Sequence, residues 1–228
     1  MPRWLSARFN GACDASRALA GRTQLGGSWQ RLPGDEARVI RELMDLQATR
    51  SVPAMNLCMR KKLPFYPGYQ LYKFLRLGIS AAMRKDYVVS DTAEVHRLDF
   101  ASQTIPRLNE TVPVLLRENT IADYLHFYFA FSHGRHGRFF LVESVDDLRF
   151  AGSMDPAARV DLASLIRPML ISRSSASAAA DFIGECTFFF NNALFRCEIS
   201  ITGTGSVRLG GETVLQSDLR AEPVDHVT

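Results

Sequence analysis

The sequence lacks the long apolar runs that mark membrane helices. A transmembrane helix needs about 20 consecutive apolar residues. The longest candidate, residues 124–131 (YLHFYFAF), is much shorter and contains His126. The first residues also lack the continuous apolar core of a secretory signal. We therefore expect a soluble, cytoplasmic protein with no transmembrane segment.

Cysteine is scarce, and no two cysteines are close in sequence. Cys13, Cys58, Cys186 and Cys197 are widely spaced and form no C-x-x-C pair. A zinc ribbon needs closely spaced ligand pairs, so that class is excluded, and we predict neither a metal nor a cofactor. Cys186 and Cys197 fall in predicted strands, where a thiol is usually a small buried hydrophobe. We expect free, reduced thiols.

Complete catalytic and nucleotide-binding motifs are also missing. The sequence has no G-x-S-x-G nucleophile elbow. Gly203-x-Gly205 is followed by a strand pattern, whereas a dinucleotide-binding fingerprint needs a third glycine and a helix. Ser132 and His133 are adjacent in sequence, but catalytic Ser and His must meet through space. No complete catalytic constellation can be assembled from these residues.

Lysine is confined to the first part of the chain, and the charge is divided unevenly. Residues 1–86 carry 15 Lys and Arg against 6 Asp and Glu, a net charge of +9, whereas residues 87–228 carry a net charge of −6. The basic half could face a polyanion or an anionic lipid surface, or it could dock on the acidic half of its own chain. The second interpretation is simpler, and we favour it.

Residues 1–34 hold five Arg and a single acid, and they end in the turn signal Pro33-Gly34. This composition is compatible with an organellar import segment and with a flexible basic arm. We favour the arm, because the chain is Arg-rich elsewhere too. The predicted organisation is an arm over 1–34, a single domain over 35–220 and a frayed tail over 221–228.

Hydrophobic periodicity predicts four helices. A helix over 35–48 has acids in its first turn and apolar residues at helical spacing. A second helix is predicted over 70–84, although Gly78 weakens it. A third, over 120–131, is apolar almost all round, which is typical of a buried helix. A fourth, over 156–164, begins with a proline at its first position.

Strand patterns are clearest near the C-terminus. Residues 194–201 (LFRCEISI) alternate strictly between apolar and polar, as expected for a half-buried antiparallel strand. Asn191-Asn192 can supply the positive φ angles of a two-residue hairpin turn. These features predict a three-strand meander over 184–210. Further strands are predicted at 86–90, 112–116, 139–143 and 166–171, and residues 145–150 are predicted to form a turn that enters another short extended piece.

Helices followed by an antiparallel meander predict an α+β fold in which helices pack on a sheet. By element order alone, the C-terminal half resembles the cone-shaped nuclear-transport-factor-2-like group, which implies a sheet curved around an apolar helix. This likeness is an analogy of layout, and no family motif accompanies it.

The segment 131–140 (FSHGRHGRFF) is the first candidate binding loop. His133, Arg135, His136 and Arg138 could direct donors at a phosphate or carboxylate. The loop follows the C-terminus of a helix, however, where glycine is a common cap and cations are favoured by the helix dipole. We favour the cap and keep ligand or anion binding as the alternative. A metal shared by His133 and His136 would need further ligands.

His126 is the second candidate, because a polar ring in an apolar helix needs a partner if it is buried. A satisfied core histidine is the simplest interpretation. The alternative is a small-molecule pocket in which His126 transfers protons together with Asp123 or Glu143.

The basic and aromatic stretch 60–74 (RKKLPFYPGYQLYKF) is the third candidate. Arg60, Lys61 and Lys62 could contact phosphates while Tyr66 and Tyr69 stack on bases. The same residues could lie on anionic lipid. Tyrosines beside prolines also commonly pack on a core, which is the interpretation that we favour.

The sequence therefore leads us to expect a non-catalytic module that binds a small ligand or another protein. The alternatives are an enzyme with a His/carboxylate acid–base pocket, and a nucleic-acid or anionic-surface binder through residues 60–74. Homo-oligomerisation is compatible with all three.

Overall fold

The computed structural model describes residues 29–47, 57–76, 83–133, 137–150, 153–175 and 180–223. Within these ranges the chain forms four α-helices and a set of strands that all pair in antiparallel fashion. The predicted α+β class is confirmed. The chain divides into two compact units, one over Gly26–Asp99 and one that contains Phe100–Thr228. The single domain over 35–220 stays a prediction.

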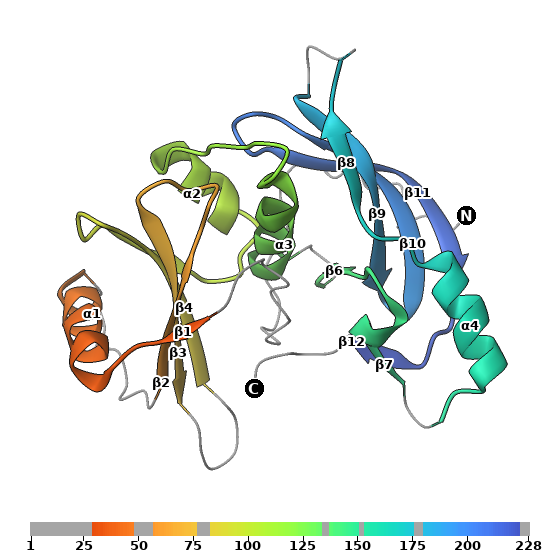
Figure 1. The fold of residues 1–228 in the computed structure, drawn as a ribbon, viewed down its shortest axis with the longest axis horizontal. Helices are drawn as coiled ribbons and strands as arrows, with labels where there is room; N and C mark the ends of the chain where they lie inside the picture. Colours follow the sequence, from red (N-terminus) through yellow and green to blue (C-terminus); the bar gives the residue numbers. More distant parts are fainter. Residues whose placement is uncertain are drawn as a thin grey trace. The chain divides into compact units, whose positions relative to one another are not determined.

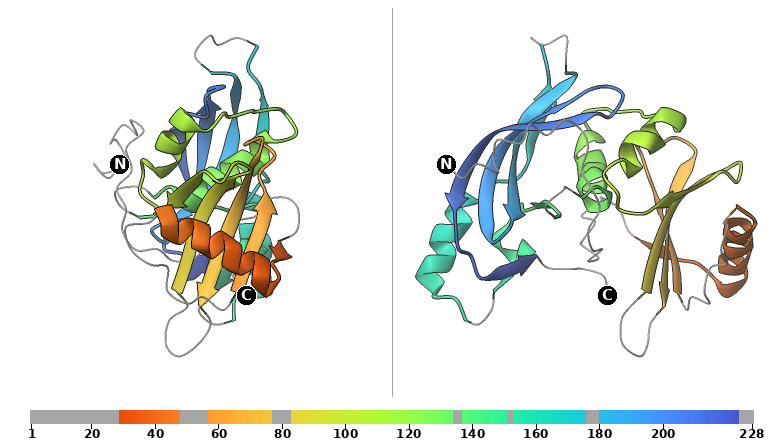
Figure 2. Two further views of the ribbon diagram at one scale, coloured as in Figure 1. Left: turned by 90° about the vertical axis from the view of Figure 1, so that its left-hand side faces the viewer. Right: turned by 180° about the vertical axis from the view of Figure 1, so that it is seen from behind.

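The first unit is a five-stranded meander with one helix. The strands pair in the order β1-β2-β3-β4-β5. Helix α1 lies across one face of the sheet, as the left view of Figure 2 shows. Met44 of the helix packs there in a core that includes Tyr72, Phe74 and Tyr87. The elements are β1 (Gln30–Arg31), α1 (Gly34–Gln47), β2 (Leu57–Lys62), β3 (Tyr69–Arg76), β4 (Met83–Ser90) and β5 (Val95–Leu98).

The helix predicted over 70–84 is wrong, because its described residues, 70–76 and 83–84, belong to strands β3 and β4. The two strands pair directly, with Tyr72 opposite Tyr87. All residues from Leu71 to Leu75 are buried, so both faces of β3 are covered. A strand buried on both faces reads as a nearly continuous apolar run and loses its two-residue period. The apolar residues of this run matched helical spacing by chance.

Among its described residues, the second unit contains three α-helices and the sheet of strands β6 and β8–β11, which Figure 1 shows on the right. Its first half consists of α2 (Thr104–Thr111), α3 (Ile121–Phe131), β6 (Phe140–Leu141), a short 3-10 helix (Val145–Asp147) and β7 (Leu148–Phe150). Its second half consists of α4 (Pro156–Leu165), β8 (Leu170–Arg173), β9 (Phe182–Phe190), β10 (Ala193–Ile201), β11 (Val207–Gln216) and β12 (Ala221–Pro223).

Strands β9, β10 and β11 form the predicted meander, which is confirmed. The first turn is Asn191-Asn192, with φ angles of 48° and 60°, as a type I′ turn requires. Strands β6 and β8 both pair with β9. We call β6, β8, β9, β10 and β11 the C-terminal sheet. Strands β7 and β12 form a separate two-stranded ribbon.

The predicted helices over 35–48, 120–131 and 156–164 correspond to α1, α3 and α4. The strand predicted over 112–116 is wrong, because that segment belongs to no strand; Pro113 has no N–H to donate to a ladder. The strand predicted over 166–171 begins only at Leu170, after Pro168. Strands β1 and β12 fall inside the predicted arm and tail.

One face of the C-terminal sheet carries α3. Phe129 of the helix meets Phe188 of β9 at 4.8 Å between ring centroids. Tyr124 donates its hydroxyl hydrogen to the carbonyl oxygen of Gly205, in the turn between β10 and β11 (2.6 Å). Gly205 has a φ of +79°, and a Cβ there would lie 2.5 Å from the Tyr124 hydroxyl oxygen. This position therefore requires glycine.

None of the helices in the described ranges has the length and apolar character that crossing a membrane would demand.

Candidate functional site

The other face of the C-terminal sheet is built from a ladder of residue pairs on β9 and β10. Counted from the Asn191-Asn192 turn, the pairs that face this side are Phe189–Leu194, Thr187–Arg196, Glu185–Glu198 and Ile183–Ser200. Side chains alternate between faces along a strand, so these pairs lie opposite the buried series that contains Cys186 and Cys197. We call this side the open face.

Helix α4 and the segment that follows it cover the part of the open face nearest the turn. Phe189 and Leu194 are buried in a core with Leu162 and Ile166. In the next pair, the Arg196 guanidinium donates a hydrogen bond to the carbonyl oxygen of Leu165 (3.2 Å). The first two pairs of the ladder therefore have partners within the unit.

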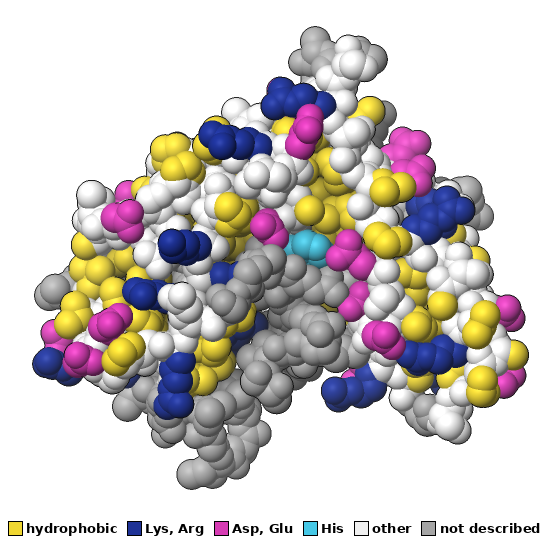
Figure 3. Space-filling view, in the orientation of Figure 1, with side chains coloured by type: hydrophobic (Ala, Val, Ile, Leu, Met, Phe, Trp, Pro, Cys, Tyr) yellow, Lys and Arg dark blue, Asp and Glu magenta, His cyan; other side chains and the backbone are white. Residues whose placement is uncertain are grey.

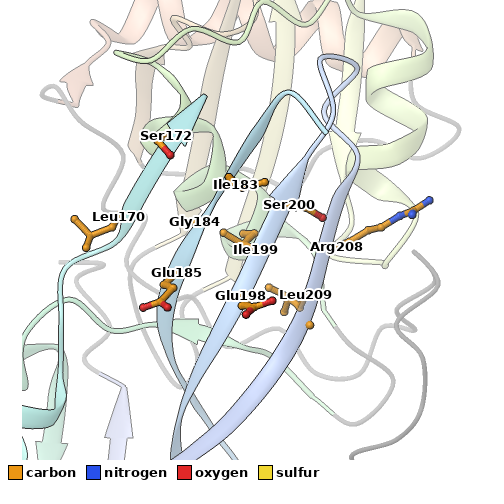
Figure 4. Close-up of a pocket in the computed structure, with 11 residues that line it drawn as sticks. Leu170, Ser172, Ile183, Gly184, Glu185, Glu198, Ile199, Ser200, Arg208 and Leu209 are labelled. Carbon is orange, nitrogen blue, oxygen red and sulfur yellow. The ribbon is translucent and has the colours of Figure 1, made fainter. Parts of the chain in front are cut away.

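The next two pairs are not covered in this way, and a hollow of about 640 Å³ lies over them. Its lining residues come from β8, β9, β10 and β11, and Figure 4 shows them on adjacent strands of one sheet. Leu170 and Ile183 are exposed by 66% and 43%. We call this hollow the sheet groove, defined by Leu170, Ser172, Ile183, Gly184, Glu185, Glu198, Ile199, Ser200, Arg208, Leu209 and Gly210.

Two carboxylates of like charge face each other in the sheet groove. Glu185 and Glu198 are direct partners in the β9–β10 register. The two-residue turn closes on a hydrogen-bonded pair, Phe190 and Ala193, and the two kinds of pair alternate along the ladder. Glu185 and Glu198 therefore fall at a non-hydrogen-bonded pair, where Cα atoms are about 4.5 Å apart and side chains are closest. Like charges in such a pair are destabilising.

A β-bulge in β11 determines how much space there is beside the Glu198 side chain. Glu198 pairs with Gly210 and Arg196 pairs with Thr213, so Gly211 and Glu212 together lie opposite a single residue of β10. Gly211 has a φ of +57°, and a Cβ there would lie 2.8 Å from Cδ of Glu198. A Cβ on Gly210 would meet nothing within 4 Å. The glycines leave room both for the Glu198 side chain and for a ligand next to it.

No cation of the described chain forms an ion pair with either of these glutamates. Arg208 also lines the groove, but in Figure 4 its side chain extends away from the two carboxylates. The groove therefore presents two negative charges beside exposed aliphatic side chains.

The structure brings together two residues of the predicted His/carboxylate site. Nε2 of His126 lies 3.2 Å from Oε2 of Glu143. The hydrogen bond with His126 lowers the pKa of the Glu143 carboxyl from its usual value, although burial opposes this shift. The N–H of Met169 donates to the other carboxylate oxygen (3.3 Å). The pair ties α3 to the chain after β6, and neither residue lines the sheet groove.

Of the predicted anion-binding loop, Arg135 and His136 lie outside the described residues. His133 is only 1% exposed, and its ring lies 5.4 Å from that of Phe100. Burial, followed by the charge of Arg138, lowers the pKa of His133 to about 4, so the ring is neutral at neutral pH. Helix α3 ends on Ser132 in extended conformation, two residues before the glycine that was expected to cap it. Anion binding stays a prediction.

The five residues predicted for nucleic-acid or surface binding lie on β2, β3 and the turn between them. Tyr66 and Lys61 are buried, and Lys61 lies over the ring of Trp29. Arg60 and Tyr69 have acidic partners, Glu36 and Glu94, while Lys62 is exposed. On the face drawn in Figure 3, charges of both signs are scattered among hydrophobic side chains. Binding through this stretch stays a prediction.

The described cysteines and acids do not point to a metal or to thiol chemistry. No group of three or more potential ligands occurs among the described residues. Cys58, Cys186 and Cys197 are free and buried. Burial raises the pKa of Cys58 and of Cys197 to about 12, which removes the reactive thiolate form.

The residues of the sheet groove were not among the predicted sites. Part of the signal was present, because the Asn191-Asn192 turn fixes the register and thereby pairs Glu185 with Glu198. Two other features depend on contacts between segments distant in sequence. They are the lining that β8 and β11 add to the groove, and the covering of only one end of the open face by α4.

The chain matches no protein-family model, no curated protein and no solved structure. The cone-shaped layout therefore stays a prediction, and no relative suggests a function.

Proposed function

We propose that this chain is a non-catalytic interaction module that holds an extended segment of a partner protein in the sheet groove. One observation carries the proposal. The open face is covered by α4 at one end. At the other end, two exposed aliphatic side chains lie beside a pair of glutamates that has no cationic partner in the described chain. A partner segment with apolar and cationic side chains is complementary to both features.

A protein segment fits the groove better than a small molecule does. Small-molecule sites usually enclose most of the ligand surface. The lining of the sheet groove comes from neighbouring strands of one sheet face (Figure 4), so a small ligand would remain largely in water. An extended chain can instead make many contacts along that surface, with alternate side chains directed at the sheet.

A displayed library of random extended peptides, selected on the full-length chain, tests this proposal. Selected peptides are then measured on Ile183→Ser and on the control Val160→Ser, which alters an exposed apolar residue on α4 outside the groove. We expect binding to weaken about tenfold, or about 1.4 kcal/mol, on Ile183→Ser and to be unchanged on the control. If the selected peptides bind Ile183→Ser as tightly as wild type, the binding surface lies elsewhere. Failure to select any peptide would count against a binding module.

An acid–base enzyme is the second candidate, and the contact between His126 and Glu143 favours it. We rank it below binding because neither residue lines the groove. We also propose a reducing, cytoplasmic location, since the three described cysteines are free.

A further inference from the structure

We infer that the segment bound in the sheet groove presents an arginine, whose guanidinium lies between Glu185 and Glu198. This inference rests on the proposed binding function and names the chemistry of the bound segment. It follows from three features of the groove: the register of the two acids, the apolar surface next to them, and the space left by the glycines of β11.

The register makes a cation the complementary ligand. Glu185 and Glu198 project from a close cross-strand pair on one face, and no Lys or Arg of the described chain forms an ion pair with them. A cation placed between the two carboxylates replaces their mutual repulsion with two attractive contacts.

The surroundings of the pair suit a long side chain with an aliphatic stem. Leu170 pairs with Glu185 across β8 and β9, and Ile183 is two residues along the same face of β9. Both are exposed. On the other side, Gly210 is the partner of Glu198 and leaves open space. An arginine stem can pack on the aliphatic side chains while its charged end reaches the acids.

Arginine fits this arrangement better than lysine or a metal ion. The guanidinium is planar and carries five N–H donors, so opposite edges can bond two carboxylates at once. It is also less strongly hydrated than an ammonium group. A metal ion would require additional ligands, and the described residues contain no group of three or more.

Gly211 is a positioning residue for this contact. Its φ of +57° and the 2.8 Å approach of its virtual Cβ to Cδ of Glu198 show that the Glu198 side chain packs against the glycine. A side chain at Gly211 would displace the Glu198 carboxylate from its place beside Glu185. The bulge therefore sets the geometry in which two acids share one cation.

The experiment uses the full-length chain and the synthetic peptide acetyl-Val-Thr-Val-Arg-Val-Thr-Val-amide. Matched peptides carry lysine or citrulline in place of arginine, and citrulline keeps the shape while removing the charge. Affinities are measured for wild type, Glu185→Gln, Glu198→Gln and the double variant. Glu212→Gln serves as the control, because Glu212 is exposed on β11 and is not part of the groove lining.

We expect the citrulline peptide to bind wild type about tenfold more weakly than the arginine peptide, with lysine between them. On the double glutamine variant this preference should fall below about twofold, and on Glu212→Gln it should persist. Raising NaCl from about 50 to about 200 mM should weaken only the binding that depends on the two glutamates.

The failures of the two proposals can be told apart. Suppose that the arginine and citrulline peptides bind wild type equally well and that Ile183→Ser weakens the binding of both. That result would overturn the arginine inference and leave the binding function standing. Library selection that yields groove-dependent peptides without arginine would lead to the same conclusion. A third outcome concerns metal ions. If about 1 mM CaCl₂ displaces the arginine peptide, and does so only when both glutamates are present, the pair is a metal-ion site and the inference is overturned.

Discussion

At the scale of single residues, His126 and His133 lie on or next to the same helix in different surroundings. His126 bonds to a carboxylate, Glu143, and is thereby satisfied. His133 is buried against Phe100, and its Nε2 has no hydrogen-bond partner among the described residues. A buried imidazole with no acceptor nearby is more stable neutral.

We expect the free energy of unfolding to decrease as pH falls from about 6.5 to about 4.5, because of His133. Its pKa is near 6.5 when unfolded and about 4 when folded, so the unfolded state binds the extra proton. Stability from the neutral ring is complete above pH 6.5 and is lost progressively below it, by about 2 kcal/mol. Denaturant titrations at several pH values measure this slope.

The variant His133→Phe should flatten the slope in that pH window, because it removes the group whose folded-state pKa is lowered. Glu143 titrates lower, because the pKa of its carboxyl is depressed in the folded protein; the stability it contributes is lost only as pH falls through that lower value. An unchanged slope in His133→Phe would show that another group is responsible.

At the scale of elements, the β9–β10 hairpin combines a well-defined turn with an unfavourable pair. The Asn191-Asn192 turn has the positive φ angles that match the twist of two strands. The register that it fixes then places Glu185 opposite Glu198. An isolated hairpin would gain from an uncharged residue at one of these positions. The proposed binding function rests on this unfavourable pair.

Glu185→Gln and Glu198→Gln should each stabilise the protein, by about 0.2–1 kcal/mol, because each removes the cross-strand repulsion. The double variant should gain little more than either single variant, since the repulsion is already gone after the first change. Thermal or urea denaturation measures the gain, and Glu212→Gln is the comparison for loss of charge alone. Destabilisation by both single variants would indicate that the glutamates have stabilising partners.

The sequence predicted well those elements whose apolar–polar periodicity is visible within one local segment. Within residues 194–201, buried and more exposed side chains alternate from Phe195 to Ile201, so the two-residue period is visible. Strand β3 is buried on both sides, and its period disappears into an apolar run that also fits a helix. The sequence placed His126 near a choice of two acids, and only the fold brought Glu143 to it.

At the scale of the whole molecule, the chain divides into two compact units, and each contains fully buried aromatic side chains. Phe74 belongs to the core beneath α1, and Phe188 contacts Phe129 of α3 in the second unit. Both side chains are fully buried. The stability of each unit should therefore respond first to changes in its own core.

We expect Phe74→Ala and Phe188→Ala each to cost about 3–5 kcal/mol, through lost burial and a residual cavity. Amide hydrogen exchange should show the loss of protection mainly in residues 26–99 for the first variant and in residues from 100 onward for the second. Equal loss throughout the chain in both variants would instead support a single cooperative domain over 35–220.

The sequence by itself determined the α+β class, the meander, the apolar helix α3 and the turn that pairs two glutamates, because each depends on neighbours along the chain. The tertiary structure decided which end of the open face α4 covers and which strands border the groove. It also decided that Tyr66 and Lys61 are buried. These outcomes depend on contacts between distant segments, and side-chain burial is a property of those contacts and not of local residue order.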